Sequence, residues 1–185
     1  MRSSRINVRS LGNKLRAAMN ARRVDDAVQI VEKHKGLLTN LKPDSADTAA
    51  LFFILSRSIE DSPTSLRVVR RLAEKYGTRR RTDMSLGDWV YVMAGRLRLA
   101  FYDHDDNEVD RLWQWLTSTA QYVAVPLEVL GAIHLAASRS RKRRGDLPAA
   151  LQRTEMAVSA YQDAKLPFMA AIGQVNQAWL LDQLG

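Results

Sequence analysis

The sequence contains no cysteine, and this absence excludes several classes of protein. Without thiols there is no disulfide-stabilised fold, no thiolate zinc site, no iron–sulfur centre and no cysteine nucleophile. Proline and glycine are scarce, at 5 and 9 of 185 residues. No apolar run approaches the roughly 18 residues that a membrane-spanning helix needs, and no apolar stretch typical of a secretory signal follows the first residues. We therefore expect a cytoplasmic protein that does not enter a membrane.

Basic residues exceed acidic ones, at 28 against 20, for a net charge of +8. Residues 1–24 contain no acidic residue. Their basic residues are Arg2, Arg5, Arg9, Lys14, Arg16, Arg22 and Arg23. This composition also suits a mitochondrial presequence, which is the alternative to a cytoplasmic location. Leu11, Leu15 and Ala18, however, form an apolar stripe, which favours a structural helix.

The periodic segments are rich in alanine, leucine, arginine and glutamine, which are strong helix formers. No alternating β-branched run is long enough to predict a strand. Ser62-Pro63 predicts a capped helix start, and Gly77 predicts a helix end. The sequence therefore predicts an all-α protein with about nine helices. Their expected ranges are 8–21, 24–39, 45–59, 63–77, 85–103, 107–123, 126–143, 147–164 and 167–184.

Helix, tight polar turn and second helix recur along the chain. After each turn comes a position where the two helices should approach closely. These positions are Ala27, Ser65, Val109 and Ala150, spaced by 38, 44 and 41 residues. A repeat near forty residues predicts an α-solenoid of antiparallel hairpins, forming one domain over 1–185. Its expected repeats are 8–39, 45–77, 85–123, 126–164 and an incomplete 167–185.

Two segments carry a family resemblance. Gly145-Asp146-Leu147-Pro148-Ala149-Ala150-Leu151, continuing to Tyr161, resembles a tetratricopeptide repeat, and so does Asn176-Gln177-Ala178-Trp179-Leu180-Leu181. The long unit is similar to the repeats of bacterial signal-responsive transcription activators. The resemblance covers 126–185 clearly, whereas 8–125 keeps the helix spacing but lacks the glycine. It implies a scaffold that binds protein partners in a regulatory protein. An unrelated helical bundle is the alternative.

No catalytic motif is present, and His34, His104 and His134 are scattered. We therefore predict no enzymatic activity, no cofactor and no metal. The acidic run Asp103-His104-Asp105-Asp106 stands at an expected helix start, where carboxylates cap free N–H groups.

Basic runs at 79–81 and 139–144 are the stronger signals. In the resembled repeat, the first helix of each hairpin lines a concave groove. That register implies a basic groove with interleaved aromatic residues. Its residues are Arg16, Asn20, Arg57, Tyr91, Arg98, Tyr102, Arg139, Lys142, Arg143 and Trp179. Such a groove would bind a protein or an acidic peptide. The alternative is a helical repeat that binds RNA or DNA phosphates.

The last expected helix carries apolar residues on more than one stripe, including Ile172, Val175 and Trp179. A terminal solenoid helix should have a polar outer face. We therefore expect either self-association through 168–184 or a native chain that continues beyond Gly185.

Overall fold

A computed structural model describes residues 7–43 and 45–185. Arg2 and Arg5 of the acid-free N-terminal segment lie outside the described residues, as does Asp44. The described chain forms ten α-helices and no strand, which confirms the predicted all-α class. No helix in these ranges combines the length and the apolar character needed to cross a membrane.

The helices group into two compact units, divided between Gly95 and Arg96 within α6. The first unit contains α1 (Val8–Asn20), α2 (Val24–Lys33), α3 (Lys35–Thr39), α4 (Ala46–Ser56), α5 (Pro63–Tyr76) and the start of α6 (Leu86–Tyr102). The second contains the end of α6, α7 (Asp106–Thr119), α8 (Leu127–Arg143), α9 (Leu147–Asp163) and α10 (Pro167–Leu184).

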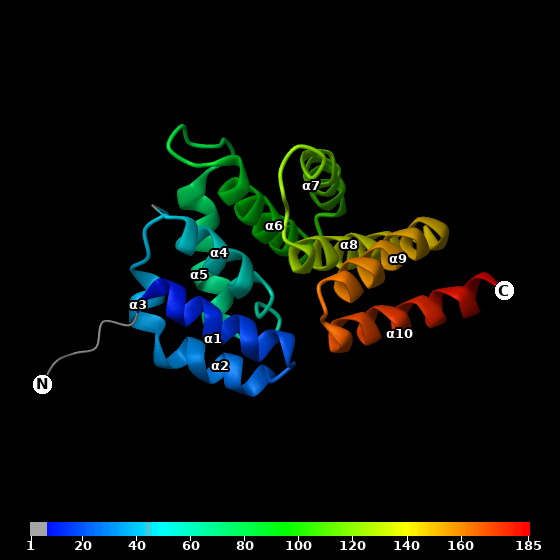
Figure 1. Ribbon diagram of the computed structural model, residues 1–185, viewed down its shortest axis with the longest axis horizontal. Helices are drawn as coiled ribbons and strands as arrows, with labels where there is room; N and C mark the ends of the chain where they lie inside the picture. Colours follow the sequence, from blue (N-terminus) through cyan, green and yellow to red (C-terminus); the bar gives the residue numbers. More distant parts are fainter. Residues whose placement is uncertain (1–6, 44) are drawn as a thin grey trace, which may run out of the picture. The chain divides into compact units, whose positions relative to one another are not determined.

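In the first unit, α4 forms the centre of the core. It packs against α1 and α5, and α1 also packs against α2 (Figure 1). Leu51, Phe52 and Phe53 on α4 are 0% exposed. A Cβ added at Gly95 of α6 would meet the Phe52 ring at 2.6 Å, so this position requires glycine for close approach.

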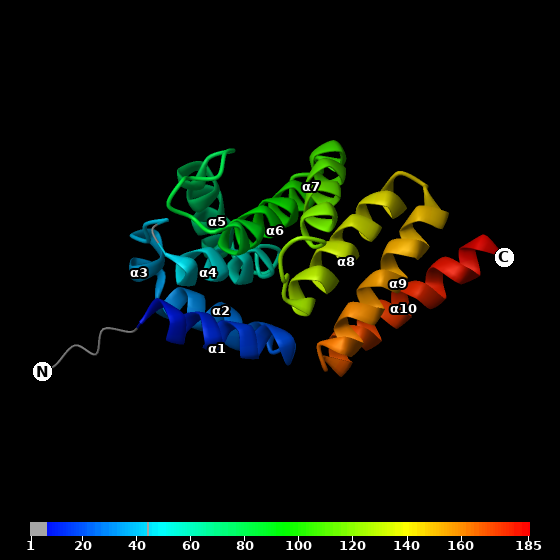
Figure 2. The same cartoon turned by 45° about the horizontal axis from the view of Figure 1, so that its top comes forward.

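In the second unit, α8 packs between α7 and α9, and α10 covers α9 on its other side (Figure 2). Leu112, Leu116 and Ile133 are fully buried at the α7 and α8 faces. Tyr161 of α9 is 1% exposed and lies against Gly131 of α8, where an added Cβ would meet its ring at 2.6 Å. The close α8–α9 approach therefore depends on this glycine.

The positions expected to lie at close helix approaches are all buried. Ala27, Ser65, Val109 and Ala150 are each 0% exposed. The Ala150 carbonyl accepts hydrogen bonds from Ser138 of α8 at 2.8 Å and from Thr154 at 2.9 Å. This confirms the burial that the spacing predicted in both units.

The helix signals around α5 act as expected. The Ser62 side chain accepts a hydrogen bond from the Ser65 N–H at 3.1 Å, and Pro63 is the first residue of α5. Gly77 ends the helix with a φ of 66°. Both interactions follow from the local sequence alone.

Four turns between consecutive helices share one geometry. Their central residues have positive φ: Arg22, His104, Gly145 and Lys165. In each turn the next N–H donates to the carbonyl five residues before it, as from Asp105 to Ala100 and from Asp146 to Arg141. This is the Schellman arrangement, which glycine ordinarily favours. The turns therefore keep the same geometry where the glycine is missing.

The prediction of one helix over 24–39 was wrong, and this explains ten helices instead of about nine. The chain bends at His34, where φ is −110° and ψ is 14°, and separates α2 from α3. Gly36 weakens the helix locally. The bend leaves Leu38 only 1% exposed, whereas Leu37 remains 37% exposed. Leu38 still lies seven residues after buried Val31, so the buried side of the segment continues across the break.

Candidate functional site

The basic run at the end of α8 is paired with carboxylates of α7. Asp110 forms ion pairs with Arg141 at 2.7 Å and with Arg153 at 2.8 Å, and it also pairs with Arg144. Asp106 pairs with Arg143 at 2.5 Å. These arginines therefore hold α7, α8 and α9 together.

The bonds around Asp110 change its acidity. Burial by itself would raise the pKa of the Asp110 carboxyl, but the bonds from Arg144 and Arg153 outweigh this effect and the pKa lies below its ordinary value. Arg153 is 5% exposed, and its guanidinium lies 4.0 Å from the centre of the Trp113 ring. The carboxylate therefore balances a buried positive charge.

His134 of α8 has a structural role in the same network. The Trp113 indole N–H donates to His134 Nδ1 at 3.0 Å, which requires an unprotonated Nδ1. Burial, together with the nearby charge of Arg153, lowers the pKa of His134 from 6.5 to about 4. The imidazole is thus a neutral hydrogen-bond acceptor at physiological pH.

The acidic run before α7 caps that helix as predicted. The Asp105 side chain accepts a hydrogen bond from the Glu108 N–H at 3.0 Å. Within 7–43 and 45–185 no group of three or more His, Asp or Glu side chains is placed to hold a metal ion. The described residues thus provide no evident metal centre.

The residues assigned to a groove by register occupy several environments. Arg57 bonds to Asn20 at 2.8 Å in the first unit, where Tyr91 packs against Phe53. In the second unit, the Lys142 ammonium lies 3.3 Å from the centre of the Trp179 ring. Arg16, Tyr102 and Arg139 are partly exposed.

Two groove candidates are largely withdrawn from solvent. Arg57 and Arg98 are each 9% exposed. Arg143 also bonds to the Phe101 carbonyl at 3.1 Å, in addition to its pairing with Asp106. These three side chains offer less accessible charge than the sequence pattern suggested.

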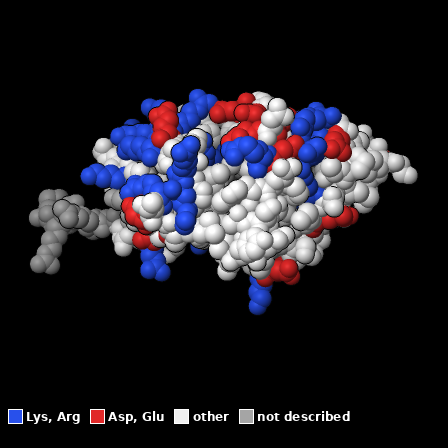
Figure 3. Space-filling model, turned by 90° about the horizontal axis from the view of Figure 1, so that it is seen from above, with Lys and Arg blue, Asp and Glu red and all other residues white. Residues whose placement is uncertain are grey.

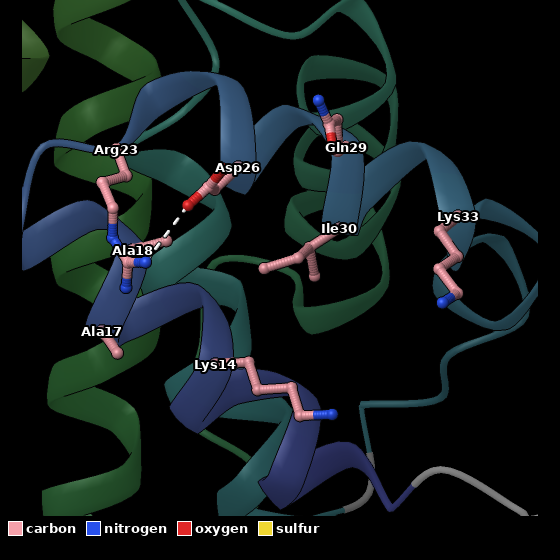
Figure 4. Close-up of a pocket in the computed structure, with 8 residues that line it drawn as sticks. All are labelled: Lys14, Ala17, Ala18, Arg23, Asp26, Gln29, Ile30 and Lys33. Atoms are coloured by element: carbon pink, nitrogen blue, oxygen red, sulfur yellow. Dashed lines mark ion pairs between the residues drawn. The ribbon is translucent and has the colours of Figure 1, made fainter.

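An open cleft lies between α1 and α2, and sequence reasoning did not identify it. Its volume is about 430 Å³. Its lining residues are Lys14, Ala17, Ala18, Arg23, Asp26, Gln29, Ile30 and Lys33. Figure 4 shows Lys14 from α1 and Lys33 from α2 on either side of the space in front of Ile30. The cleft therefore combines positive charge with an apolar surface.

The cations of this cleft differ in their partners. Arg23 pairs with Asp26 at 3.2 Å, and both side chains are more than half exposed. Among the described residues, neither Lys14 nor Lys33 has an ion pair or a side-chain hydrogen bond. The two ammonium groups are therefore available to an anionic ligand.

A shallower hollow of about 450 Å³ adjoins the cleft along α1. It shares Lys14 and Ala17 with the cleft and adds Arg9, Ser10 and Asn13. The basic surface thus continues towards the start of α1. The sequence signal that could have located it is the outward position of these residues, away from the Leu11 and Leu15 stripe.

Net charge is divided unequally between the two units. The first contains 18 basic and 10 acidic residues, which gives +8, whereas the second contains 10 of each. Figure 3 shows many Lys and Arg side chains, with fewer Asp and Glu, at the end next to the grey N-terminal residues. The whole formal charge excess therefore belongs to the unit that contains the cleft.

The α10 helix presents an apolar surface of a different kind. Val175 is 71% exposed, Trp179 41% and Leu181 50%. Ile172, by contrast, packs partly against the cluster around Tyr161 and Ala170. Of the three residues expected to mediate self-association, Val175 and Trp179 are accessible and Ile172 also supports the core.

No family model, no curated protein and no solved structure matches this chain.

Proposed function

We propose that this chain is a non-enzymatic helical scaffold that binds an acidic protein partner through its first unit. The observation that carries the proposal is the charge division: a formal charge of +8 in the first unit against zero in the second. An unbalanced charge attracts oppositely charged partners and increases their rate of association.

Three further observations support a binding role. Lys14 and Lys33, which have no ion pair among the described residues, flank an open cleft. Ala27 near the start of α2 and Ala150 near the start of α9, two small residues expected at close helix approaches, are fully buried. The pattern of 126–185 resembles tetratricopeptide repeats, and this supports a scaffold role in bacterial regulation.

Nucleic acid is the second candidate partner, and the same charge excess favours it. Phosphates would then supply most of the affinity, which would fall steeply as salt increases. The protein-partner proposal is preferred because the cleft exposes Ile30 and Ala17 beside its cations, and these side chains add nothing to phosphate binding.

Fluorescence anisotropy with three labelled probes tests the proposal. The probes are an acidic peptide, a single-stranded RNA and a duplex DNA of similar net charge. We expect the peptide to bind best at physiological salt. Tighter binding of either nucleic acid, with a steep dependence on salt, would replace the protein partner by nucleic acid.

A further inference from the structure

We propose that the cleft between α1 and α2 binds an acidic peptide segment that contains one apolar anchor residue. This inference rests on the proposed function and specifies its site and ligand. Lys14 and Lys33 would bind carboxylates, and Ile30 would contact the anchor.

The charges of the cleft define the first requirement. Each lysine ammonium offers three hydrogen-bond donors and no acceptor, so it selects anions. Lys14 and Lys33 come from different helices and border one space (Figure 4). A ligand with more than one negative group can therefore pair with both lysines.

The apolar part of the cleft defines the second requirement. Ile30 is only partly buried and lines the space together with Ala17. Covering this surface removes apolar area from water, which favours formation of the complex. A polyphosphate offers nothing to cover it, whereas an aliphatic side chain does.

Size and local geometry are consistent with a peptide. The volume of about 430 Å³ falls within the roughly 300–1,000 Å³ of ordinary ligand sites. The Gln29 amide at the rim can both donate to and accept from a peptide backbone. Asp26 already pairs with Arg23, so the negative charge of this cleft residue is balanced and repels an acidic ligand less.

The test uses a labelled peptide of glutamates around one central leucine. The variant Lys14→Glu/Lys33→Glu reverses both free charges of the cleft. The matched control, Lys35→Glu/Lys42→Glu, changes net charge equally at two exposed lysines of the same unit that do not line the cleft. Lys14→Gln/Lys33→Gln serves as a milder second variant, and circular dichroism verifies that each variant is folded.

We expect the cleft reversal to weaken peptide binding at least about tenfold, the equivalent of about 1.4 kcal/mol. The control should weaken it by about twofold or less, because separated surface charges are screened by salt. Replacing the peptide leucine by serine should weaken binding to the unaltered protein. It should have little effect on the cleft variant.

Each contrary result has a distinct meaning. Equal losses in the cleft and control variants would overturn the cleft as the site, while leaving the proposed function intact. Absence of binding by any acidic peptide would overturn the proposed function itself. Tighter binding of a matched oligonucleotide that depends on Lys14 and Lys33 would assign the cleft to phosphates and overturn the peptide ligand.

Discussion

The two units use their basic residues in opposite ways. In the second unit, Arg141, Arg143 and Arg144 pair with carboxylates of α7, and the formal charges cancel. In the first unit the excess of +8 is unbalanced, and Lys14 and Lys33 at the cleft form no ion pair with any residue of 7–43 or 45–185. A dense basic run can therefore be occupied by ion pairs within the fold, whereas two dispersed lysines remain accessible.

The largest expected effect tests whether the second unit depends on its ion pairs. Asp110→Asn would leave Arg153, whose side chain is 6% exposed, without its carboxylate. Loss of one partner from a buried pair costs about 3–5 kcal/mol. Urea denaturation should show this decrease in the free energy of unfolding.

The matched control is Asp83→Asn in the first unit. The side chains of the Arg81–Asp83 pair are 42% and 62% exposed. Exposed pairs contribute little to stability because water and salt screen them, so this variant should change the free energy of unfolding far less than Asp110→Asn does. Similar losses in the two variants would contradict the contrast between the units.

The next effect is a pH dependence that we expect to arise in the second unit. As pH falls below 6.5, His134 becomes protonated in the unfolded chain, whereas in the folded protein it stays neutral down to about pH 4. The folded state therefore loses stability as pH falls from 6.5 to 4, by on the order of 3 kcal/mol once the shift is complete.

The substitution His134→Asn should remove this slope while keeping an oxygen acceptor for the Trp113 N–H. His34→Asn provides the histidine control in the first unit and should leave the slope in place. Unfolding free energies measured between pH 4 and 7 distinguish these outcomes. A slope that persists in His134→Asn would assign it to other groups.

The third prediction asks whether both units tolerate overpacking equally poorly. Ala150→Leu and Ala27→Leu each enlarge a side chain that is 0% exposed. Each should destabilise the protein by about 1–3 kcal/mol, measured as a lower Tm. An unchanged Tm for either variant would show that the space around that alanine can accommodate a larger side chain.

The smallest expected effect on folding is on α10, where we expect self-association. The helix carries one charged residue, Asp182, so the surface of α10 itself adds little charge repulsion between two copies. Val175→Glu should dissociate the assembly in sedimentation experiments. Because Val175 is 71% exposed, stability should change by no more than about 0.5 kcal/mol.

Gln174→Glu adds the same charge at the neighbouring exposed position, which points about 100° away around the helix, and it should dissociate the assembly less. A monomer at high concentration would exclude self-association through α10. An assembly that survives Val175→Glu must use another surface.

The sequence was sufficient for features that depend on neighbouring residues. Helix periodicity, the Ser62 cap, the Gly77 end and the burial of Ala27 and Ala150 follow from local patterns. The break at His34 was not predictable, because the buried spacing from Val31 to Leu38 is the same as in an unbroken helix. The Schellman turn at His104 was also hidden, since the sequence there lacks glycine.

The candidate site divides in the same way. The sequence determined the excess of positive charge and the positions of the basic runs. Only the tertiary structure decided which charges form ion pairs within the fold, because Asp110 is 31 and 43 residues away from Arg141 and Arg153 along the chain. Packing of Leu112 and Leu116 orients α7 so that its carboxylates meet those arginines. Within the part of the chain that the structure describes, no acidic side chain pairs with Lys14 or Lys33. An ion pair depends on distance in space, and residue spacing along the chain does not specify that distance between separate helices.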